Sequence, residues 1–526
     1  MKNAAQFVSS AAPEPVVKLI NAFDSPYDNS VATARTCYSS RVIYADDVRK
    51  DESTRQRRDS IAKSIYLAGH HTTLQHATFQ FVLEKVSRQC IWSFLHSHPF
   101  YNSEQVSQRY VSVAPENFTI PLLNSEQKEL YLSAVNMLMG AYVKLQELLT
   151  PVVELEYKRL FPHRNLTEKR WQGAIKKRCQ EVARYVLPVA THAHLYHTIS
   201  GVTLLRYARL CRLYDAPAEQ RVLAAKMVAA VEEKDPDFFK NAEDPLTLEE
   251  TPEHRFFNSQ EAGPSRDPSR FCQEFDQSLG GLTSKLADYK VNGQKVMAGA
   301  VRSLLGLLQS EMTDAQAISW VMDPAKNSYL SETLNVTHHT KLSRAMAHPH
   351  FTFRKKISHT ADSQDQRHRT TPGSRPVLAR HFSRTPDYVL PKLIRSDASA
   401  QDYYESVMED LWLRMEALLN SGAEMEATLY LLPNAFPIRF EESGSLLDFH
   451  HKWSHRLCYT AQEEIWQNCL EEVRQVREIA PEIAQYLYAP CTQRAAAGRK
   501  PFCPEGDRYC GVPVWTQTLN QYERIL

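Results

Sequence analysis

The chain has 526 residues, of which 43% are hydrophobic and 23% charged, so it is too long for one ordinary core and too apolar for wholesale disorder; we start from two domains. Its 62 basic and 61 acidic residues nearly balance, which argues against a protein whose main task is to grip nucleic acid through a basic surface. No run approaches about eighteen apolar residues, and residues 1–15 lack the blocks of a secretory signal, so we expect a cytoplasmic protein with no membrane partner.

The first half of the chain mixes strand and helix patterns. Thr78–Val82 alternates aromatic and β-branched residues, which predicts a strand, and the apolar run Val16–Ile20 predicts another. Apolar residues recur at spacings of three and four in three further segments, which predicts helices over Asn29–Tyr38, Ser53–Ala68 and Ser125–Leu160. We therefore expect an α/β domain over residues 1–240.

A proline-rich segment separates the two halves. From Asp235 to about Gly281, Pro236, Pro245, Pro252, Pro264 and Pro268 interrupt any helical period. Proline lacks a backbone donor and restricts the residue before it, so this segment cannot be one long helix or a central strand. We interpret residues 241–281 as a linker and residues 282–526 as a second domain.

The second half repeats the succession of the first. Helical patterns at Val296–Gln309, Asp314–Val321 and Gln401–Leu419 flank a His-His-Thr turn and a short aromatic strand. The anchors return in order, since Gly69–Leu74 matches Thr337–Leu342 and Val186–Pro188 matches Leu431–Pro433. This order predicts an internal duplication.

Three polar side chains of the first half alternate along one stretch. Gln105, Ser107 and Arg109 give an extended face with an amide, a hydroxyl and a guanidinium. Arginine offers a planar fork that matches a phosphate monoester, and the hydroxyl and loop amides can fill its remaining oxygens. The spacing alone favours the alternative, a polar loop whose groups satisfy one another.

The motifs around these residues resemble those of the flavin-dependent thymidylate synthases (ThyX). The chain keeps His76, Phe79, Val86-Ser87-Arg88 and the Ser107-x-Arg109-Tyr110 run. It departs from the family at Gln75, where the family has Glu, and at Ser97-His98-Pro99, where the family has Arg-His-Arg. The resemblance implies that Gln105, Ser107 and Arg109 bind the nucleotide and that Thr72, Gln75 and His76 contact flavin.

The second half departs from the family in the opposite way. Ile357-Ser358-His359 replaces Val-Ser-Arg, but Arg367-His368-Arg369 follows it, and in the family this signature contacts flavin and the substrates. Thr370–Pro376 does not resemble the phosphate loop. Each half thus keeps a motif that the other has lost. Taken alone, Arg-His-Arg is more often a solvated basic turn.

A downstream block of the family also returns twice. It reads Ala183–Pro188 in the first half, so the resemblance implies that Arg184 contacts the uracil nucleotide, and Arg212 falls near the final arginine of the family. In the second half Leu429 replaces the nucleotide arginine, while Arg456 persists before Ala461-Gln462 as a flavin-binding candidate. The alternative for these arginines is a surface helix charge.

The resemblance implies a fold and a reaction. The fold would be α/β (α+β), two copies of a ThyX-like unit with a mixed or antiparallel sheet flanked by helices. The reaction would be reductive methylation of dUMP with FAD, methylenetetrahydrofolate and NADPH, with Ser107, Arg109 and Arg184 as the catalytic residues.

Family members form tetramers with active sites between subunits. The resemblance therefore implies a homodimer of this chain that forms a pseudo-tetramer, with a composite site in which Arg367, His368 and Arg369 of one unit face Gln105, Ser107 and Arg109 of another. Two alternatives stay open. One is an enzyme for another pyrimidine nucleotide or a modified base, and the other is a nucleotide-binding scaffold without catalysis.

The ten cysteines are too sparse for a disulfide scaffold, and we expect them to be reduced. The family's reaction requires no cysteine nucleophile, and Cys90, the thiol nearest the matched motifs, is interpreted as a core residue. Cys491, Cys503 and Cys510 crowd near the end of the chain, where His450, His451 or Cys469 could add a fourth zinc ligand. Without short CxxC pairs, packing cysteines are the favoured interpretation and no metal site is predicted.

Overall fold

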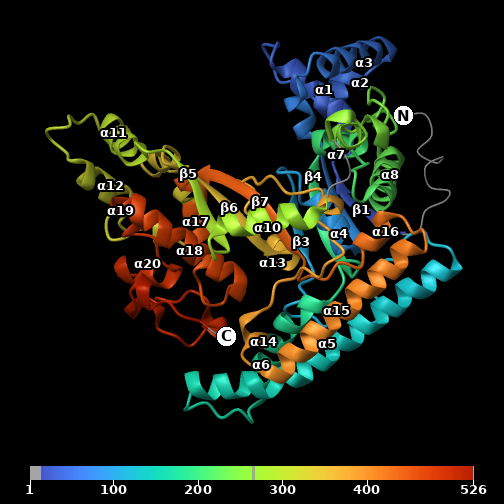
Figure 1. The fold of residues 1–526 in the computed structure, drawn as a ribbon. Helices are drawn as coiled ribbons and strands as arrows, with labels where there is room; N and C mark the ends of the chain where they lie inside the picture. The colour runs from blue at the N-terminus through green and yellow to red at the C-terminus, as the bar shows by residue number, and fades with distance from the viewer. Residues whose placement is uncertain (1–13, 263–266, 525) are drawn as a thin grey trace.

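The computed structural model describes residues 14–262, 267–524 and 526, and it contains two antiparallel sheets (Figure 1). The first has the order β1-β2-β4-β3, from β1 (Val16–Ala22), β2 (Thr78–Ser87), β3 (Asn102–Gln105) and β4 (His192–Ser200). The second has the order β5-β6-β7, from β5 (Ser284–Tyr289), β6 (His350–Ser358) and β7 (Pro437–Ser445). Four of the predicted linker's residues, 263–266, lie outside the described residues.

Strand periodicity explains how each sheet buries one face. In β2, Phe79, Phe81 and Leu83 are fully buried, and the residues between them are less so. In β6 the equivalent Phe351 and Phe353 are buried in the same alternation. Side chains alternate between the two faces of a strand, so these residues form the layer against which the helices pack.

Helices flank both sheets. Those of the first unit are α1 (Pro26–Thr36), α2 (Ala45–Arg49), α3 (Glu52–Leu67), α4 (Arg88–Cys90), α5 (Ser125–Leu160), α6 (Lys169–Ala183), α7 (Gly201–Arg209) and α8 (Pro217–Lys234). The segment between the units carries α9 (Pro252–Phe257) and α10 (Pro268–Leu279). The second unit has α11 (Gly293–Leu305), α12 (Asp314–Met322), α13 (His359–Asp365), α14 (Lys392–Arg395), α15 (Ala398–Asn420), α16 (Met425–Leu429), α17 (Leu446–Arg456), α18 (Glu463–Ile479), α19 (Pro481–Ala484) and α20 (Pro490–Ala496). The predicted fold class, two similar α/β units, is confirmed.

The two units share one arrangement. β1, β2 and β4 correspond to β5, β6 and β7, and the long helices α5 and α15 correspond and run side by side (Figure 1). The same spacing of 245 residues separates Pro188 from Pro433 and Ser200 from Ser445. β3 has no equivalent strand, because a single bridge from Gly373 to β7 stands at that edge.

The units interlock through reciprocal contacts. Two matched segments exchange backbone hydrogen bonds, from Val189 N to Leu432 O (2.8 Å) and from Asn434 N to Leu187 O (2.8 Å). Side chains of the two units also form reciprocal hydrogen bonds. The Tyr185 hydroxyl donates to Glu464 (2.5 Å) and the Tyr430 hydroxyl donates to Glu219 (2.7 Å).

Those two carboxylates have the same local task. Glu219 accepts from the backbone N–H of Ser87 at 2.8 Å, and Glu464 accepts from that of Ser358 at 2.6 Å. Each serine is the last residue of an inner strand, β2 or β6, and caps a short helix. A buried hydrophobic cluster continues from α5 through α15 into the second sheet. The two units therefore share buried contacts and part of one hydrophobic core.

The segment between the units is not featureless. α10 lies within the residues predicted as linker, and its Asp276 pairs with Lys356 (2.6 Å) and Arg439 (2.8 Å) of the second sheet. Cys272, Phe275 and Leu279 are the buried residues of this helix. α10 thus packs with the second unit. Within the part of the chain that the structure describes, no helix is long and apolar enough to cross a bilayer.

Candidate functional site

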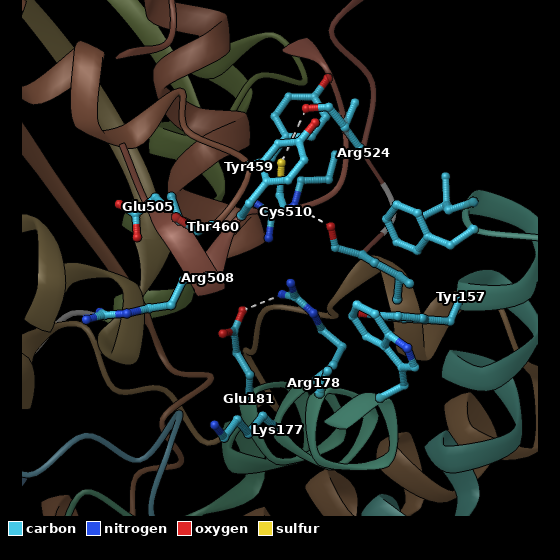
Figure 2. A pocket seen from close by; sticks show the side chains of 18 of the residues that line it. Tyr157, Lys177, Arg178, Glu181, Tyr459, Thr460, Glu505, Arg508, Cys510 and Arg524 are labelled. Carbon is cyan, nitrogen blue, oxygen red and sulfur yellow. Dashed lines mark hydrogen bonds and ion pairs between the residues drawn. The ribbon is translucent and has the colours of Figure 1, made fainter. Parts of the chain in front are cut away.

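A cavity of about 1010 Å³ lies where the first unit, the second unit and the end of the chain meet (Figure 2). Arg178 and Glu181 come from α6 of the first unit, and Tyr459 and Thr460 from the turn after α17 of the second. The third wall is the tail segment, which we define as residues 498–524. The tail's lining residues include Glu505, Asp507, Arg508, Tyr509, Cys510, Val512, Gln517, Gln521, Glu523 and Arg524.

Arg109 connects the two units at this cavity. Its backbone N–H donates to the Ser107 hydroxyl (3.2 Å), which holds the loop that follows β3. Its Nε donates to Glu181 and its Nη2 donates to Thr460 O of the second unit (2.8 Å). The predicted phosphate-binding arginine is therefore held in a composite pocket, with part of its guanidinium already engaged.

Glu181 is the carboxylate at the centre of an arginine cluster. It accepts from Arg178 Nη1 at 2.8 Å, and its backbone carbonyl accepts from Arg184 Nε at 3.2 Å. Burial alone would raise the pKa of Glu181, but the guanidiniums of Arg109, Arg178 and Arg184 outweigh burial and lower it to about 2. Glu181 is thus a permanent anion among several cations.

Arg184 lies behind this carboxylate and is not among the lining residues. It is buried, and its Nη2 has no hydrogen-bond acceptor among the described residues. Burial lowers its pKa, while Glu181 opposes that shift. A buried guanidinium with an unmet donor retains capacity to bind an anion.

Arg456 lines the same cavity from the second unit and is held by α13 and the turn after it. Its Nε donates to His368 Nε2 (3.0 Å) and its Nη2 to Gln364 O (3.0 Å). The buried Lys452 pairs with Asp365 at 2.8 Å, which fixes the end of α13. Burial and the neighbouring Arg456 hold the pKa of His368 well below its usual range, so its ring is neutral and accepts. His368 thus supports Arg456.

Arg367 and Arg369 lie elsewhere, against β3 of the first unit. Arg367 Nη2 donates to Ser103 O (3.3 Å), and the Arg369 guanidinium lies 5.0 Å from the centre of the Tyr101 ring. Both line a separate groove of about 550 Å³ with Tyr196 and other residues of that sheet. The second unit's Arg-His-Arg therefore meets the first unit within one chain, at β3 rather than at Ser107 and Arg109.

The remaining loop residues are engaged within the protein. Gln105 accepts from Arg88 Nη1 at 3.3 Å. In the second unit, the segment 370–376 lies along β7, and its Arg375 pairs with buried Asp362 at 2.8 Å. That pairing explains physically why this segment does not serve as a second phosphate loop.

Four further predicted site residues also lie away from the cavity. Thr72, Gln75 and His76 are exposed on a short 3₁₀ helix (His71–His76) of the first unit. Arg212 lies between α7 and α8, near Glu249, which belongs to the segment after α8. Arg212 is absent from the cavity lining. Their binding roles stay predictions.

The thiols near the site are protonated. Burial raises the pKa of Cys510, which lines the cavity, to about 11, and that of Cys491 to about 12. Burial also raises the pKa of Cys90 and of Cys503. Among the residues that the structure describes, no group of three or more His, Cys, Asp or Glu side chains is placed to hold a metal ion.

Sequence reasoning missed several lining residues. Glu181 precedes Arg184 by three positions, a spacing that puts two helical residues on one face, so this carboxylate had a usable signal. Arg178 lies one turn further back in the same helix. Arg508 and Arg524 carried no signal, because they belong to the irregular tail segment.

Comparison with known proteins matches this chain to a protein family. Residues 18–237 and 285–482 match the family described as Thy1, thymidylate synthase complementing protein. Flavin-dependent thymidylate synthases are similar: that of Clostridium tetani is 26% identical over 43% of this chain and 85% of its own length, and that of Saccharolobus solfataricus 25% over 40% and 78%. That of Nitratidesulfovibrio vulgaris is 30% identical over 32% and 71%. A crystal structure of a UMP/dUMP methylase, PolB from Streptomyces cacaoi, bound with 5-Br dUMP, matches 43% of this chain and 94% of its own at 15% identity and a TM-score of 0.30. With both units matched, the chain belongs to the flavin-dependent thymidylate synthase (Thy1) family.

Proposed function

We propose that this chain methylates the uracil ring of dUMP, with FAD bound and with methylenetetrahydrofolate and NADPH as cosubstrates. The observation that carries the proposal is the convergence of Arg109, Arg178 and Arg456, from two units, on one cavity around Glu181. Family membership supplies the class of reaction. Each unit contributes arginines to the same cavity, so the two matched regions act as one site.

The arginines bind the nucleotide's phosphate in this proposal. Arg109 and Arg178 are held by Glu181, which fixes the direction of both guanidiniums before a ligand arrives. A preorganised fork loses little side-chain entropy on binding, and charge-assisted hydrogen bonds to phosphate are strong. Arg184 adds positive potential from behind.

The cavity fits a flavin in size and in chemistry. Its volume of about 1010 Å³ is at the upper end for ligand pockets, which suits two ligands side by side. Tyr157 offers an aromatic ring, and Lys177 and Arg508 offer cations for a pyrophosphate. The flavin supplies hydride chemistry when it is bound, while the protein orients the nucleotide and keeps its thiols protonated.

Thr72, Gln75 and His76 reach such a site only from a second copy of the chain, because they are exposed away from the cavity of their own. We therefore include a homodimer, a pseudo-tetramer of four units, in the proposal. The ordered return of the sequence anchors supports a tandem duplication as the origin of the two units.

The test is flavin content together with release of tritium from ring C5 of labelled dUMP. We expect a yellow protein whose spectrum is bleached by NADPH and which releases tritium only when dUMP and methylenetetrahydrofolate are present. If the protein binds dUMP but retains no flavin, the enzyme proposal fails and the chain is a nucleotide-binding scaffold.

A further inference from the structure

The tail segment forms one wall of the cavity, yet it lies beyond residue 482, where the second family match ends. Its placement is specific. The Tyr459 hydroxyl donates to Gln517 (3.3 Å) and accepts from the backbone N–H of Glu523 (3.2 Å). The buried Tyr522 packs edge-on against the Tyr459 ring, with centroids 5.9 Å apart. These contacts of the tail segment with Tyr459 hold the neighbouring Arg524 at the cavity.

Arg524 is a buried cation, and its Nε donates to Leu526 O. It is 5% exposed, and neither Nη1 nor Nη2 has a hydrogen-bond acceptor among the described residues. Burial lowers its pKa to about 9, and Arg178 and Arg109 shift it in the same direction, against Glu181 and Glu463. Buried N–H donors without acceptors are costly, so a ligand that accepts from both Nη atoms gains affinity.

The protein's own carboxylates do not meet this demand. Glu181 already accepts from Arg109 and Arg178. Glu463 faces Lys392 at 3.7 Å, and burial raises its pKa. The cluster thus holds a surplus of more than one positive charge, which suits an anion with two negative charges.

We propose that Arg524 binds the phosphate of the nucleotide, and that the tail segment completes a pocket that the two family units leave open on this side. The identity of the nucleotide rests on the proposed function above. A phosphate monoester carries nearly two negative charges at neutral pH and several acceptor oxygens, so it can accept from both Nη atoms of Arg524 and from Arg178.

Calorimetric titration of the full chain with dUMP, deoxyuridine and inorganic phosphate tests this inference. We expect Arg524→Gln to weaken dUMP binding by about 10- to 100-fold and to leave deoxyuridine binding unchanged. The matched control is Arg499→Gln, since this tail arginine donates to Ser331 O (3.4 Å) outside the cavity and its loss should not change either affinity.

Thermal unfolding separates binding from structure. Because both Nη atoms of Arg524 lack an acceptor among the described residues, Arg524→Gln should unfold at the same temperature as the wild type or higher without ligand, but gain less from added phosphate. Arg524→Lys keeps a charge and should recover part of the dUMP affinity. If Arg524→Gln is destabilised or does not fold, the inference is overturned, since the guanidinium of Arg524 would then be structural.

The remaining outcomes distinguish the two proposals. Equal dUMP affinity in the wild type and Arg524→Gln would overturn the role of Arg524 and leave the proposed reaction standing. If the wild type binds phosphate but not dUMP, and Arg524→Gln loses phosphate binding, the anion site stands and the nucleotide assignment fails.

Discussion

Two glutamates at equivalent positions of the two units have opposite electrostatic environments. Glu181 and Glu426 are separated by the same 245 residues as Pro188 and Pro433. Arginines lower the pKa of Glu181 to about 2, although burial opposes this. Burial raises the pKa of Glu426 to about 7, with only a hydrogen bond from the Ala218 N–H (3.2 Å) and the charge of Arg221 to offset it.

The residues around these carboxylates differ in the same sense. At the same spacing, Leu429 stands in place of Arg184 and Cys211 in place of Arg456, and both replacements are buried. Cations surround Glu181 and are available to a ligand, whereas buried apolar side chains stand at the equivalent positions around Glu426. The comparison teaches that a pair of similar units can build one composite anion site while the equivalent position becomes core.

Separating the units should have the largest effect. We expect residues 1–262 and 267–526, expressed apart, to lack activity and a cooperative unfolding transition, because each unit would lose the partner of its buried Glu219 or Glu464. Circular dichroism and tritium release measure both properties. A single half that folds and makes dTMP would contradict the composite site.

Next in size is the loss of the central carboxylate. Glu181→Gln leaves Arg109 and Arg178 without their buried anion, and should lower the free energy of unfolding by about 3 to 5 kcal/mol. The matched change Glu426→Gln should be nearly neutral at slightly alkaline pH, since it removes a charge that burial disfavours. Urea unfolding of both variants checks this, and equal losses would refute the contrast between the two positions.

Smaller changes are expected from the arginines themselves. Arg109→Ala and Arg184→Ala should each weaken dUMP binding by about 1.5 to 3 kcal/mol, because the first removes a charge-assisted donor and the second removes positive potential behind Glu181. The control is Arg375→Ala in the second unit, which breaks the pair with Asp362 and should reduce stability but not dUMP affinity. Unchanged affinity in both binding variants would place the nucleotide elsewhere.

Local patterns predicted most of the fold. The alternation of Phe79 and Phe81 identified β2, although β2 continues to Ser87, and helical spacing located α5 and α15. The prolines hid α10, because Pro268 stands at the first position of this helix, where proline is tolerated.

The site was only partly predictable. Arg109 and Arg456 carried motif signals, but their meeting depends on how two units separated by hundreds of residues pack together. The cofactor-binding role of His368 stays a prediction, while its contact with Arg456 could be found only in the folded structure. Arg524 had no local pattern at all, since its proposed role rests on two buried Nη atoms that lack acceptors among the described residues.

The smallest effect concerns the pH dependence of stability through Glu426. Its folded pKa, about 7, lies above the ordinary value of 4.5, so the folded state retains the proton longer than the unfolded state. This group's contribution to stability is complete below about pH 4.5 and is lost as the pH rises through about 7. Each unit of pKa difference corresponds to about 1.4 kcal/mol. Solvent screening at this half-buried side chain reduces the total contribution of Glu426 to about 1 kcal/mol.

Urea unfolding at about pH 5 and about pH 8 measures this contribution. The wild type should lose more stability over that interval than Glu426→Gln, because other titrating groups contribute equally to both proteins. Glu181 has the opposite sign, since its contribution is present above pH 4.5 and is lost only as the pH falls through about 2. An identical pH dependence in the wild type and Glu426→Gln would show that the Glu426 carboxyl is solvated, and that the two equivalent positions differ in their arginines but not in burial.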